Sequence, residues 1–133
     1  MDLKYWISNT AIEIRNFFKF NVIGRIRHGF DIRDTWNLDS SIGRYIVPRL
    51  KFFIINKPAG HPSLLDDADF VAKHNLKQYV GDGEDNYAAW IIILNKILVA
   101  FSFIAVEDNI NRTSSDVEEG LRLFAIFCTS LWD

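Results

Sequence analysis

The stretch of sequence that decides the fold is WIIILNKILVAFSFIAV, from Trp90 to Val106. It is shorter than the roughly 20 apolar residues that a helix needs to cross a bilayer, and Asn95 and Lys96 interrupt its middle. A helix that is apolar on nearly every side is instead buried at the centre of its own domain or against another subunit. The sequence therefore predicts a central, nearly all-apolar helix, and no contact with a membrane.

Helical spacing of apolar residues recurs on both sides of this stretch, whereas strand-like alternation does not. The predicted helices cover about residues 9–28, 37–56, 64–75, 86–109 and 115–131. We expect Gly29 to end the first helix and Pro48 to bend the second, and we expect Ser115 and Glu118 to form a capping box that begins the last. The chain is thus predicted to be all-α, a single domain over residues 1–133 built as a bundle of about five helices.

The composition fits a globular protein and hides an uneven distribution of charge. Of 133 residues, 49% are hydrophobic and 24% are charged, which excludes wholesale disorder. Residues 1–57 carry ten basic and five acidic side chains, while the remainder carries five and twelve. Such a split can attract an anionic ligand to one face or let two copies meet head to tail, but ordinary helical surface charge explains it as well. Binding to duplex DNA is disfavoured, because it usually needs a strongly basic domain.

The sequence carries no recognisable catalytic motif. It has no glycine-rich phosphate loop, no spaced glycine triplet after a strand and no HExxH pair. His28, His61 and His74 are scattered, and their spacing relative to the aspartates matches no standard metal site. Cys128 falls on the apolar stripe of the last predicted helix, so we interpret it as a packing residue. We therefore predict that the protein is not an enzyme and that it has neither a cofactor nor a metal site.

The segment from Arg25 to Asp39 is the best candidate for a binding site, because cations, carboxylates and an aromatic ring gather around a turn. Guanidinium groups bind phosphate through two parallel hydrogen bonds, and an indole offers a flat surface for stacking. The predicted ligand-binding residues are Arg25, Arg27, His28, Arg33, Asp34, Trp36, Asp39 and Tyr45. Two plainer interpretations stay open: Arg33 pairs with Asp34 or Asp39, and Trp36 fills the core.

Several motifs resemble those of a family of small all-helical proteins encoded by tailed bacteriophages. The resemblance rests on Arg27–Asp31, Asp34–Asp39, Ile46–Leu50, Gly60–Pro62, Trp90–Phe101, Glu119–Phe124 and Leu131–Asp133. It implies that the protein acts in the cytoplasm of an infected bacterial host. Small phage proteins often counter host defences, some by trapping nucleotide-derived immune signals in an oligomer, and we extend this to the present chain by analogy.

Three functions from different classes follow. The leading hypothesis is a phage accessory protein that binds and sequesters a small anionic, nucleotide-derived ligand as a homo-oligomer, and so counters host immune signalling. The alternative is a protein–protein interaction module that inhibits a host defence protein or modulates phage DNA metabolism. A third hypothesis is an enzyme that cleaves a phosphodiester with the histidines and aspartates.

Overall fold

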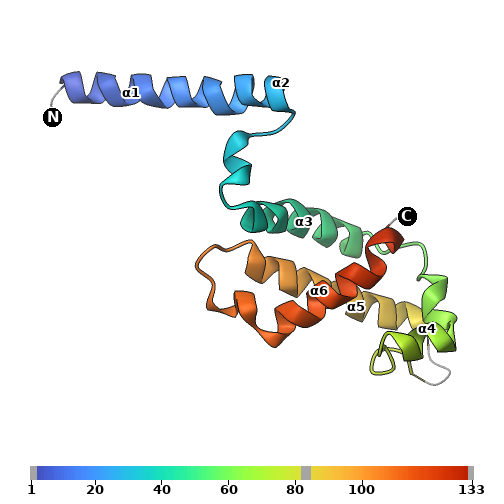
Figure 1. The fold of residues 1–133 in the computed structure, drawn as a ribbon. Helices are drawn as coiled ribbons and strands as arrows, with labels where there is room; N and C mark the ends of the chain where they lie inside the picture. Colours follow the sequence, from blue (N-terminus) through green and yellow to red (C-terminus); the bar gives the residue numbers. More distant parts are fainter. Residues whose placement is uncertain (1–2, 82–84, 132–133) are drawn as a thin grey trace. The chain divides into compact units, whose positions relative to one another are not determined.

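The computed structural model describes residues 3–81 and 85–131, and every regular element in these two ranges is helical (Figure 1). The predicted all-α fold is therefore confirmed. The longer helices are α1 (Leu3–Phe17), α3 (Leu38–Ile55), α5 (Asn86–Ile104) and α6 (Ser115–Phe127). Backbone contacts group the chain into two compact units, Met1–Ser41 and Ile42–Asp133, and each is described by itself below. The expectation of one domain over residues 1–133 stays a prediction.

The first unit is built on one long stretch of helix. It consists of α1, a π-helical turn η1 (Phe18–Ile23) and α2 (Gly24–His28), so it begins earlier than the predicted start near residue 9. Gly29 ends the helix as predicted: its φ of 80° is in the left-handed region, and its N–H donates to Arg25 O at 2.8 Å. A 3-10 turn, η2 (Ile32–Thr35), follows at once.

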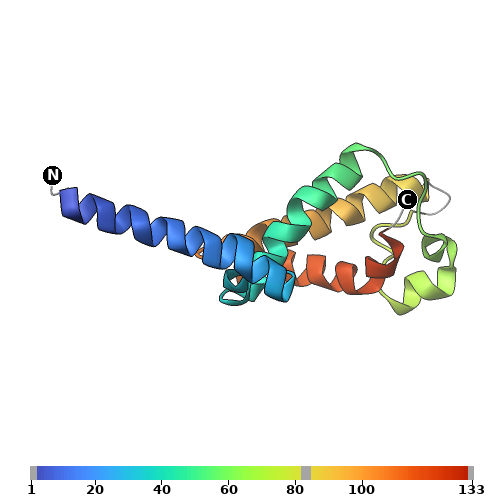
Figure 2. The ribbon, with the colours of Figure 1, turned by 90° about the horizontal axis from the view of Figure 1, so that it is seen from above.

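The core of the second unit forms around α5, as the sequence predicts (Figures 1 and 2). The buried residues of this helix are Ala89, Trp90, Ile93, Leu94, Ile97, Ala100 and Phe101. They pack against Leu50 of α3 and against Leu123 and Phe127 of α6. By length and composition α5 is the one described helix that could cross a membrane, and its buried residues belong to the core of the second unit. The helix ends at Ile104, short of the predicted Asn109.

Two glycines let neighbouring backbones approach α5 closely. A Cβ at Gly120 of α6 would lie 2.2 Å from Ala100 Cβ and 2.6 Å from Lys96 O. A Cβ at Gly43 of α3 would lie 2.7 Å from the backbone nitrogen of Ala105. Both separations are far below van der Waals contact, so glycine is required where α3 and α6 meet α5.

The short connecting elements differ in detail from the predictions. The helix expected near residues 64–75 is split into η3 (Ser63–Asp66) and α4 (Ala68–Lys73), because the Asp67 side chain accepts from the N–H groups of Asp69 and Phe70 and starts a new helix. The loop before it covers residues 57–62. Pro48 lies inside α3, and the bend predicted there stays a prediction.

Two expectations about α6 are wrong. The capping box at Ser115 and Glu118 does not form, because the cap is Ser114, whose carbonyl oxygen accepts from the N–H groups of Val117 and Glu118. The Ser114 hydroxyl is buried and has no hydrogen-bond partner among the described residues. Cys128 is exposed and not packed, because α6 ends at Phe127 and a 3-10 turn, η5 (Cys128–Ser130), turns the thiol outward.

The close approach of α6 to α5 gives a direct test of the packing. We expect Gly120→Ala to lower the free energy of unfolding by about 2 kcal/mol, because overpacking costs more than the gain in helix propensity. Urea unfolding of the purified chain measures this change. Gly60→Ala is the matched control, since no atom lies within 4 Å of its Cβ position and its stability should change little. Equal stabilities of the two variants would contradict the packing.

Candidate functional site

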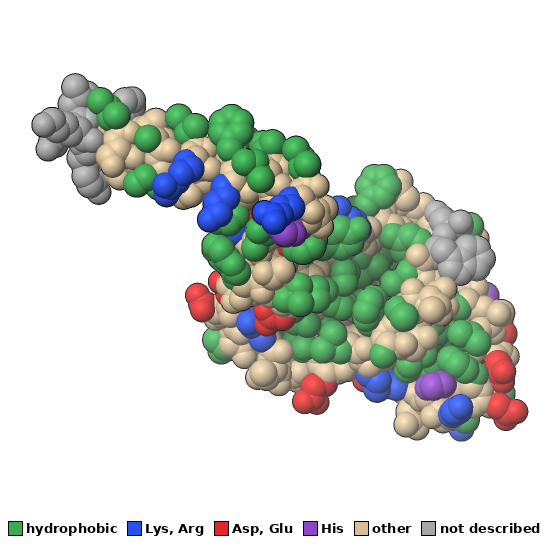
Figure 3. Space-filling view, turned by 45° about the horizontal axis from the view of Figure 1, so that its top comes forward, with side chains coloured by type: hydrophobic (Ala, Val, Ile, Leu, Met, Phe, Trp, Pro, Cys, Tyr) green, Lys and Arg blue, Asp and Glu red, His purple; other side chains and the backbone are tan. Residues whose placement is uncertain are grey.

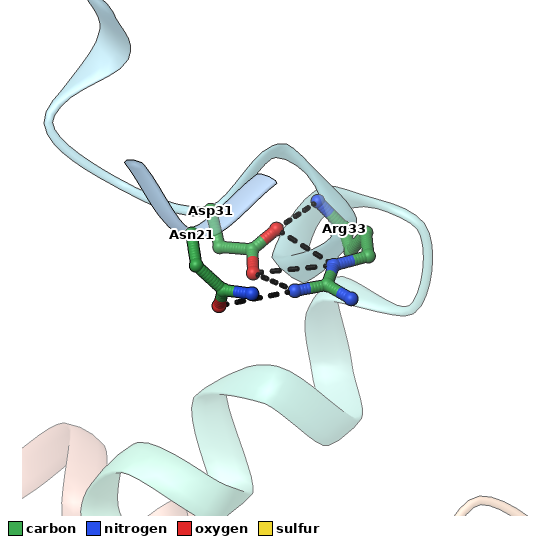
Figure 4. Close-up of polar contacts among 3 residues, drawn as sticks. All are labelled: Asn21, Asp31 and Arg33. Carbon is green, nitrogen blue, oxygen red and sulfur yellow. Dashed lines mark hydrogen bonds and ion pairs between the residues drawn. The ribbon is translucent and has the colours of Figure 1, made fainter. Parts of the chain in front are cut away.

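The predicted binding segment is organised by an ion pair that the sequence analysis did not anticipate. Asp31 caps η2, and its Oδ1 accepts from the Arg33 N–H at 3.0 Å. The Arg33 guanidinium turns back onto the same carboxylate: Nε donates to Oδ1 at 3.0 Å, and Nη2 donates to Oδ2 at 2.6 Å (Figure 4). Nη2 also donates to Asn21 Oδ1 of η1 at 3.3 Å. Bidentate charge-assisted bonds of this kind are among the strongest in proteins.

Aromatic contacts fix the other side of Arg33. Its guanidinium lies 4.6 Å from the centroid of the Phe20 ring, and Trp36 meets the same ring edge to face at 5.7 Å. Trp36 remains 65% exposed, so the interpretation that it fills the core is wrong. Arg33 thus fastens η2 to the long helix. Its partner is Asp31, where the plainer interpretation expected Asp34 or Asp39.

The electrostatics agree with a structural role for this pair. Asp31 is buried, and the hydrogen bond from Arg33 holds the pKa of its carboxyl below its usual value. Arg25 contributes a smaller attraction to the same carboxylate. Asp34 in turn helps to raise the pKa of Arg33, after the larger contribution of Asp31. The charge of Arg33 is therefore balanced mainly by Asp31, with smaller contributions from Arg25 acting on Asp31 and from Asp34 acting on Arg33.

The remaining cations of the segment lie at the end of the long helix. Arg25, Arg27 and His28 occupy the last turn of α2, and all three are exposed. Cations are stabilised there by the negative end of the helix dipole, which gives them a structural reason for their position. The His28 ring lies 6.1 Å from the Phe30 ring, whereas Arg27 has no ion-pair partner among the residues described. Arg27 is the cation of this group that is most available for a partner.

The last two predicted residues have local roles. Asp39 accepts from the backbone N–H of Ser40 at 2.8 Å at the start of α3. Tyr45 belongs to the second unit, where the Arg49 guanidinium lies 3.6 Å from the centroid of its ring. The residues that sequence reasoning missed are Asn21, Phe20 and Asp31. Only Asp31 carried a signal, because an aspartate directly before a turn often caps it.

The second unit contains a pair of the histidine–aspartate type. His61 Nε2 lies 3.0 Å from Asp66 Oδ1, and Asn86 Nδ2 donates to the same oxygen at 2.6 Å. These bonds, with that of Asn86 first, lower the pKa of Asp66. A cavity of about 510 Å³ beside them is lined by Ser63 and Ser130, but no hydrogen bond joins either serine to His61 within the described ranges. We interpret the pair as a tie between η3 and the start of α5, not as a catalytic relay.

A second polar cluster holds the segment after α4 against α6. Tyr79 Oη donates to Glu119 Oε1 at 2.5 Å, and Arg122 donates to both oxygens of Glu119. Arg122 also donates to the carbonyl oxygen of His74. The bonds from Arg122, followed by that of Tyr79, lower the pKa of Glu119 to about 2. Burial and the neighbouring carboxylate raise the pKa of Tyr79 to about 12. Every strong donor here is satisfied, so the cluster is a clamp.

The remaining feature is an apolar groove between α3 and α6. It has a volume of about 280 Å³ and is lined by Tyr45, Ile46, Arg49, Leu50, Phe53, Phe124 and Leu131. Figure 3 shows hydrophobic side chains gathered around a hollow in this part of the chain. Arg49 stands at the groove, where Nη1 donates to Tyr45 O at 2.8 Å. Its other guanidinium nitrogens have no hydrogen-bond partner among the described residues.

The clamp predicts a specific dependence of stability on pH. Because the pKa of Glu119 is lowered from 4.5 to about 2 by folding, its stabilising effect is complete above pH 4.5 and is lost as the pH falls toward 2. We expect Glu119→Gln to lower the free energy of unfolding by roughly 1.5–3 kcal/mol at pH 7. The difference from the original chain should shrink between pH 4.5 and 2, measured by urea unfolding.

Glu118→Gln is the matched control for the clamp. Glu118 is the exposed neighbour on the same helix, so its replacement should change stability little at either pH. A gap between Glu119→Gln and the original chain that stays constant down to pH 3 would contradict the role of the clamp.

Comparison with known proteins gives no match: neither a protein-family model, nor a curated protein, nor a solved structure is similar to this chain. The resemblance to small phage proteins therefore stays a prediction.

Proposed function

We propose that this chain is a protein–protein interaction module whose groove between α3 and α6 binds an amphipathic helix of a partner protein. The observation that carries the proposal is the groove itself, which is walled almost entirely by apolar side chains and remains open within the second unit. A hydrophobic groove between two helices is a common receptor for the apolar face of a third. Apolar surface of this kind gains free energy when a partner removes it from water.

The size of the groove favours side chains of a partner over a whole small molecule. Its volume of about 280 Å³ is at or below the lower limit of typical small-molecule sites, which run from about 300 to 1,000 Å³. Arg49 adds a polar requirement, because its guanidinium is held on the Tyr45 ring with donors still available. The partner helix therefore carries large apolar residues on one face and a carboxylate that reaches Arg49. The resemblance to phage proteins favours a host protein in the bacterial cytoplasm.

The groove can be tested with a pair of double variants on one helix. In a pull-down from bacterial lysate, we expect the original chain to retain one bacterial protein in stoichiometric amount. We expect the double variant Tyr45→Ala/Arg49→Glu to lose that protein. The predicted loss of affinity is at least about 30-fold, as for removal of a binding hot spot. Light scattering of the isolated chain reports whether a second copy fills the groove instead.

The matched control is Lys51→Glu/Phe52→Ala, which changes exposed residues of α3 outside the groove. It should retain the same partner as the original chain. The proposal is wrong if the groove variant keeps every protein that the original chain keeps, or if the original chain captures none. Circular dichroism confirms that both variants keep their helices.

A second candidate function is capture of a small anionic ligand by the first unit. What supports it is the exposure of Arg25, Arg27 and His28 together with the accessible indole of Trp36. The pairing of Arg33 with Asp31 removes the donors that sequence reasoning expected to be strongest. Capture would therefore rest on Arg25 and Arg27, with a second copy completing the site.

The capture hypothesis makes its own prediction. Isothermal titration with ADP-ribose and with a cyclic nucleotide should show binding that Arg25→Gln/Arg27→Gln weakens at least about tenfold, because each charge-assisted bond is worth roughly 1.5–3 kcal/mol. Ligand released by heating should be chemically intact. Lys73→Gln/Lys77→Gln removes two exposed cations of the second unit and serves as the control. Absence of binding by the original chain, or recovery of degraded ligand, would exclude capture.

A further inference from the structure

The long N-terminal helix carries a stripe of exposed apolar side chains. Ile7, Ile14 and Phe18 follow one another at spacings of seven and four residues, which places them on one face of the helix. Each of the three is about half exposed, and Ile26 further along is 81% exposed. Side chains of this size are rarely left in water in such a row.

The π-helical turn keeps this stripe straight. In an uninterrupted α-helix, Phe18 and Ile26 would point in directions about 80° apart. Eight residue steps turn the helix by about 800°, which is about 80° more than two full turns. A π turn takes roughly one residue more than an α turn. The turn η1, Phe18–Ile23, therefore returns Ile26 to the face of Phe18, so the apolar stripe continues along the whole helix. Such turns are often found at functional sites.

A row of cations runs beside the stripe. Arg15 and Lys19 are four residues apart, and the same π turn brings Arg27 into line with them. All three are exposed, and none forms an ion pair with a described carboxylate, in contrast to Arg33. Glu13 is the one acidic residue between residues 3 and 28. Figure 3 shows hydrophobic side chains along one edge of this helix and Lys and Arg side chains along the adjacent edge.

Near its C-terminal end, the opposite face of the helix is covered by the segment that follows it. Phe20 packs against Arg33 and Trp36 of the following segment. Gly24 is buried, and a Cβ there would come within 3.9 Å of Ile32 Cγ1. The helix is therefore covered on its inner face at Phe20 and Gly24, and its outer face is both apolar and cationic.

We propose that residues 3–28 form an interfacial helix that binds the surface of an anionic lipid bilayer. An amphipathic helix with large apolar residues on one face and Lys and Arg beside them lies in the plane of the interface, with the apolar face among the acyl chains and the cations at the phosphates. This site is separate from the groove of the second unit, and it replaces the expectation that the chain makes no membrane contact.

The charges favour this occupant over the others. A second copy that packed through the same face would bring like-charged rows toward each other, which costs free energy. The stripe from Ile7 to Ile26 is about 29 Å long at 1.5 Å per residue, and a bilayer offers both an apolar layer and phosphates along that whole length. An acidic protein would need a matching groove of the same length.

Vesicle flotation with the full chain tests the proposal. We expect binding to vesicles of phosphatidylcholine with phosphatidylglycerol, weak binding to phosphatidylcholine alone, and loss of binding at high salt. Replacement of the cationic row in Arg15→Gln/Lys19→Gln/Arg27→Gln should weaken binding to the anionic vesicles on the order of 100-fold, since each basic residue contributes roughly fivefold. The control Lys51→Gln/Lys73→Gln/Lys77→Gln removes the same charge from exposed positions of the second unit and should bind normally.

Two further arms identify the source of the interaction. Phe18→Asp/Ile26→Asp should abolish flotation, whereas Ile110→Asp, at a position that is 91% exposed on another element, should not. Excess free ADP-ribose should not release the chain from vesicles, because a soluble phosphate lacks the acyl layer. The proposal is overturned if the original chain does not float with the anionic vesicles, and a self-association that Phe18→Asp/Ile26→Asp abolishes would then assign the stripe to a second copy. Equal binding to both kinds of vesicle, or equal loss in the two triple variants, also overturns it.

Discussion

Burial of α5 is the interaction on which the second unit depends. The helix places Trp90, Ile93, Leu94 and Ile97 in the core with almost no exposure, and full burial of each such side chain contributes roughly 1.5–3 kcal/mol. Because α5 is apolar around most of its circumference, α3 and α6 must pack against it. Glycines 43 and 120 allow both to come close. The tie between Asp66 and Asn86 and the clamp at Glu119 then fix the surrounding segments at the edge of this core.

The first unit depends on a different kind of interaction. It has few buried residues, and its compactness comes from Arg33, which links the Asp31 carboxylate, Asn21 and the Phe20 ring. Because these contacts engage Nε and Nη2 of Arg33, its guanidinium has few donors left for a ligand. The two proposed binding surfaces therefore depend on other cations. These are Arg49 at the groove, and the row of Arg15, Lys19 and Arg27 on the long helix.

How much the sequence could predict follows from the range of the physical signal. Apolar periodicity and the left-handed preference of Gly29 are local, so α5 and the end of the first helix could be predicted. The N-cap of α6 could not be predicted, because Ser114 and Ser115 are the same residue type. The turn that precedes α6 decides which of the two caps it. The ion-pair partner of Arg33 could not be predicted either, because spacing along the chain leaves Asp31, Asp34 and Asp39 equally possible. The choice depends on how η2 folds back onto Phe20. Cys128 was misplaced because the stripe was extended one residue beyond the end of its helix.

The π turn in the first unit also bears on how this chain can change over generations. A π turn is a helix holding one surplus residue, so loss of a single codon between Phe18 and Ile23 would leave an ordinary α-helix there. Such a deletion would keep the composition and the helicity of the segment nearly intact. It would also keep Ile26 on the face of Phe18, because the seven residue steps then separating them turn an α-helix by about 700°, only about 20° short of two full turns. Homologous chains can therefore keep this surface with or without the π turn, provided that the turn and one residue are lost together, whereas loss of the turn alone would displace Ile26 by about 100°.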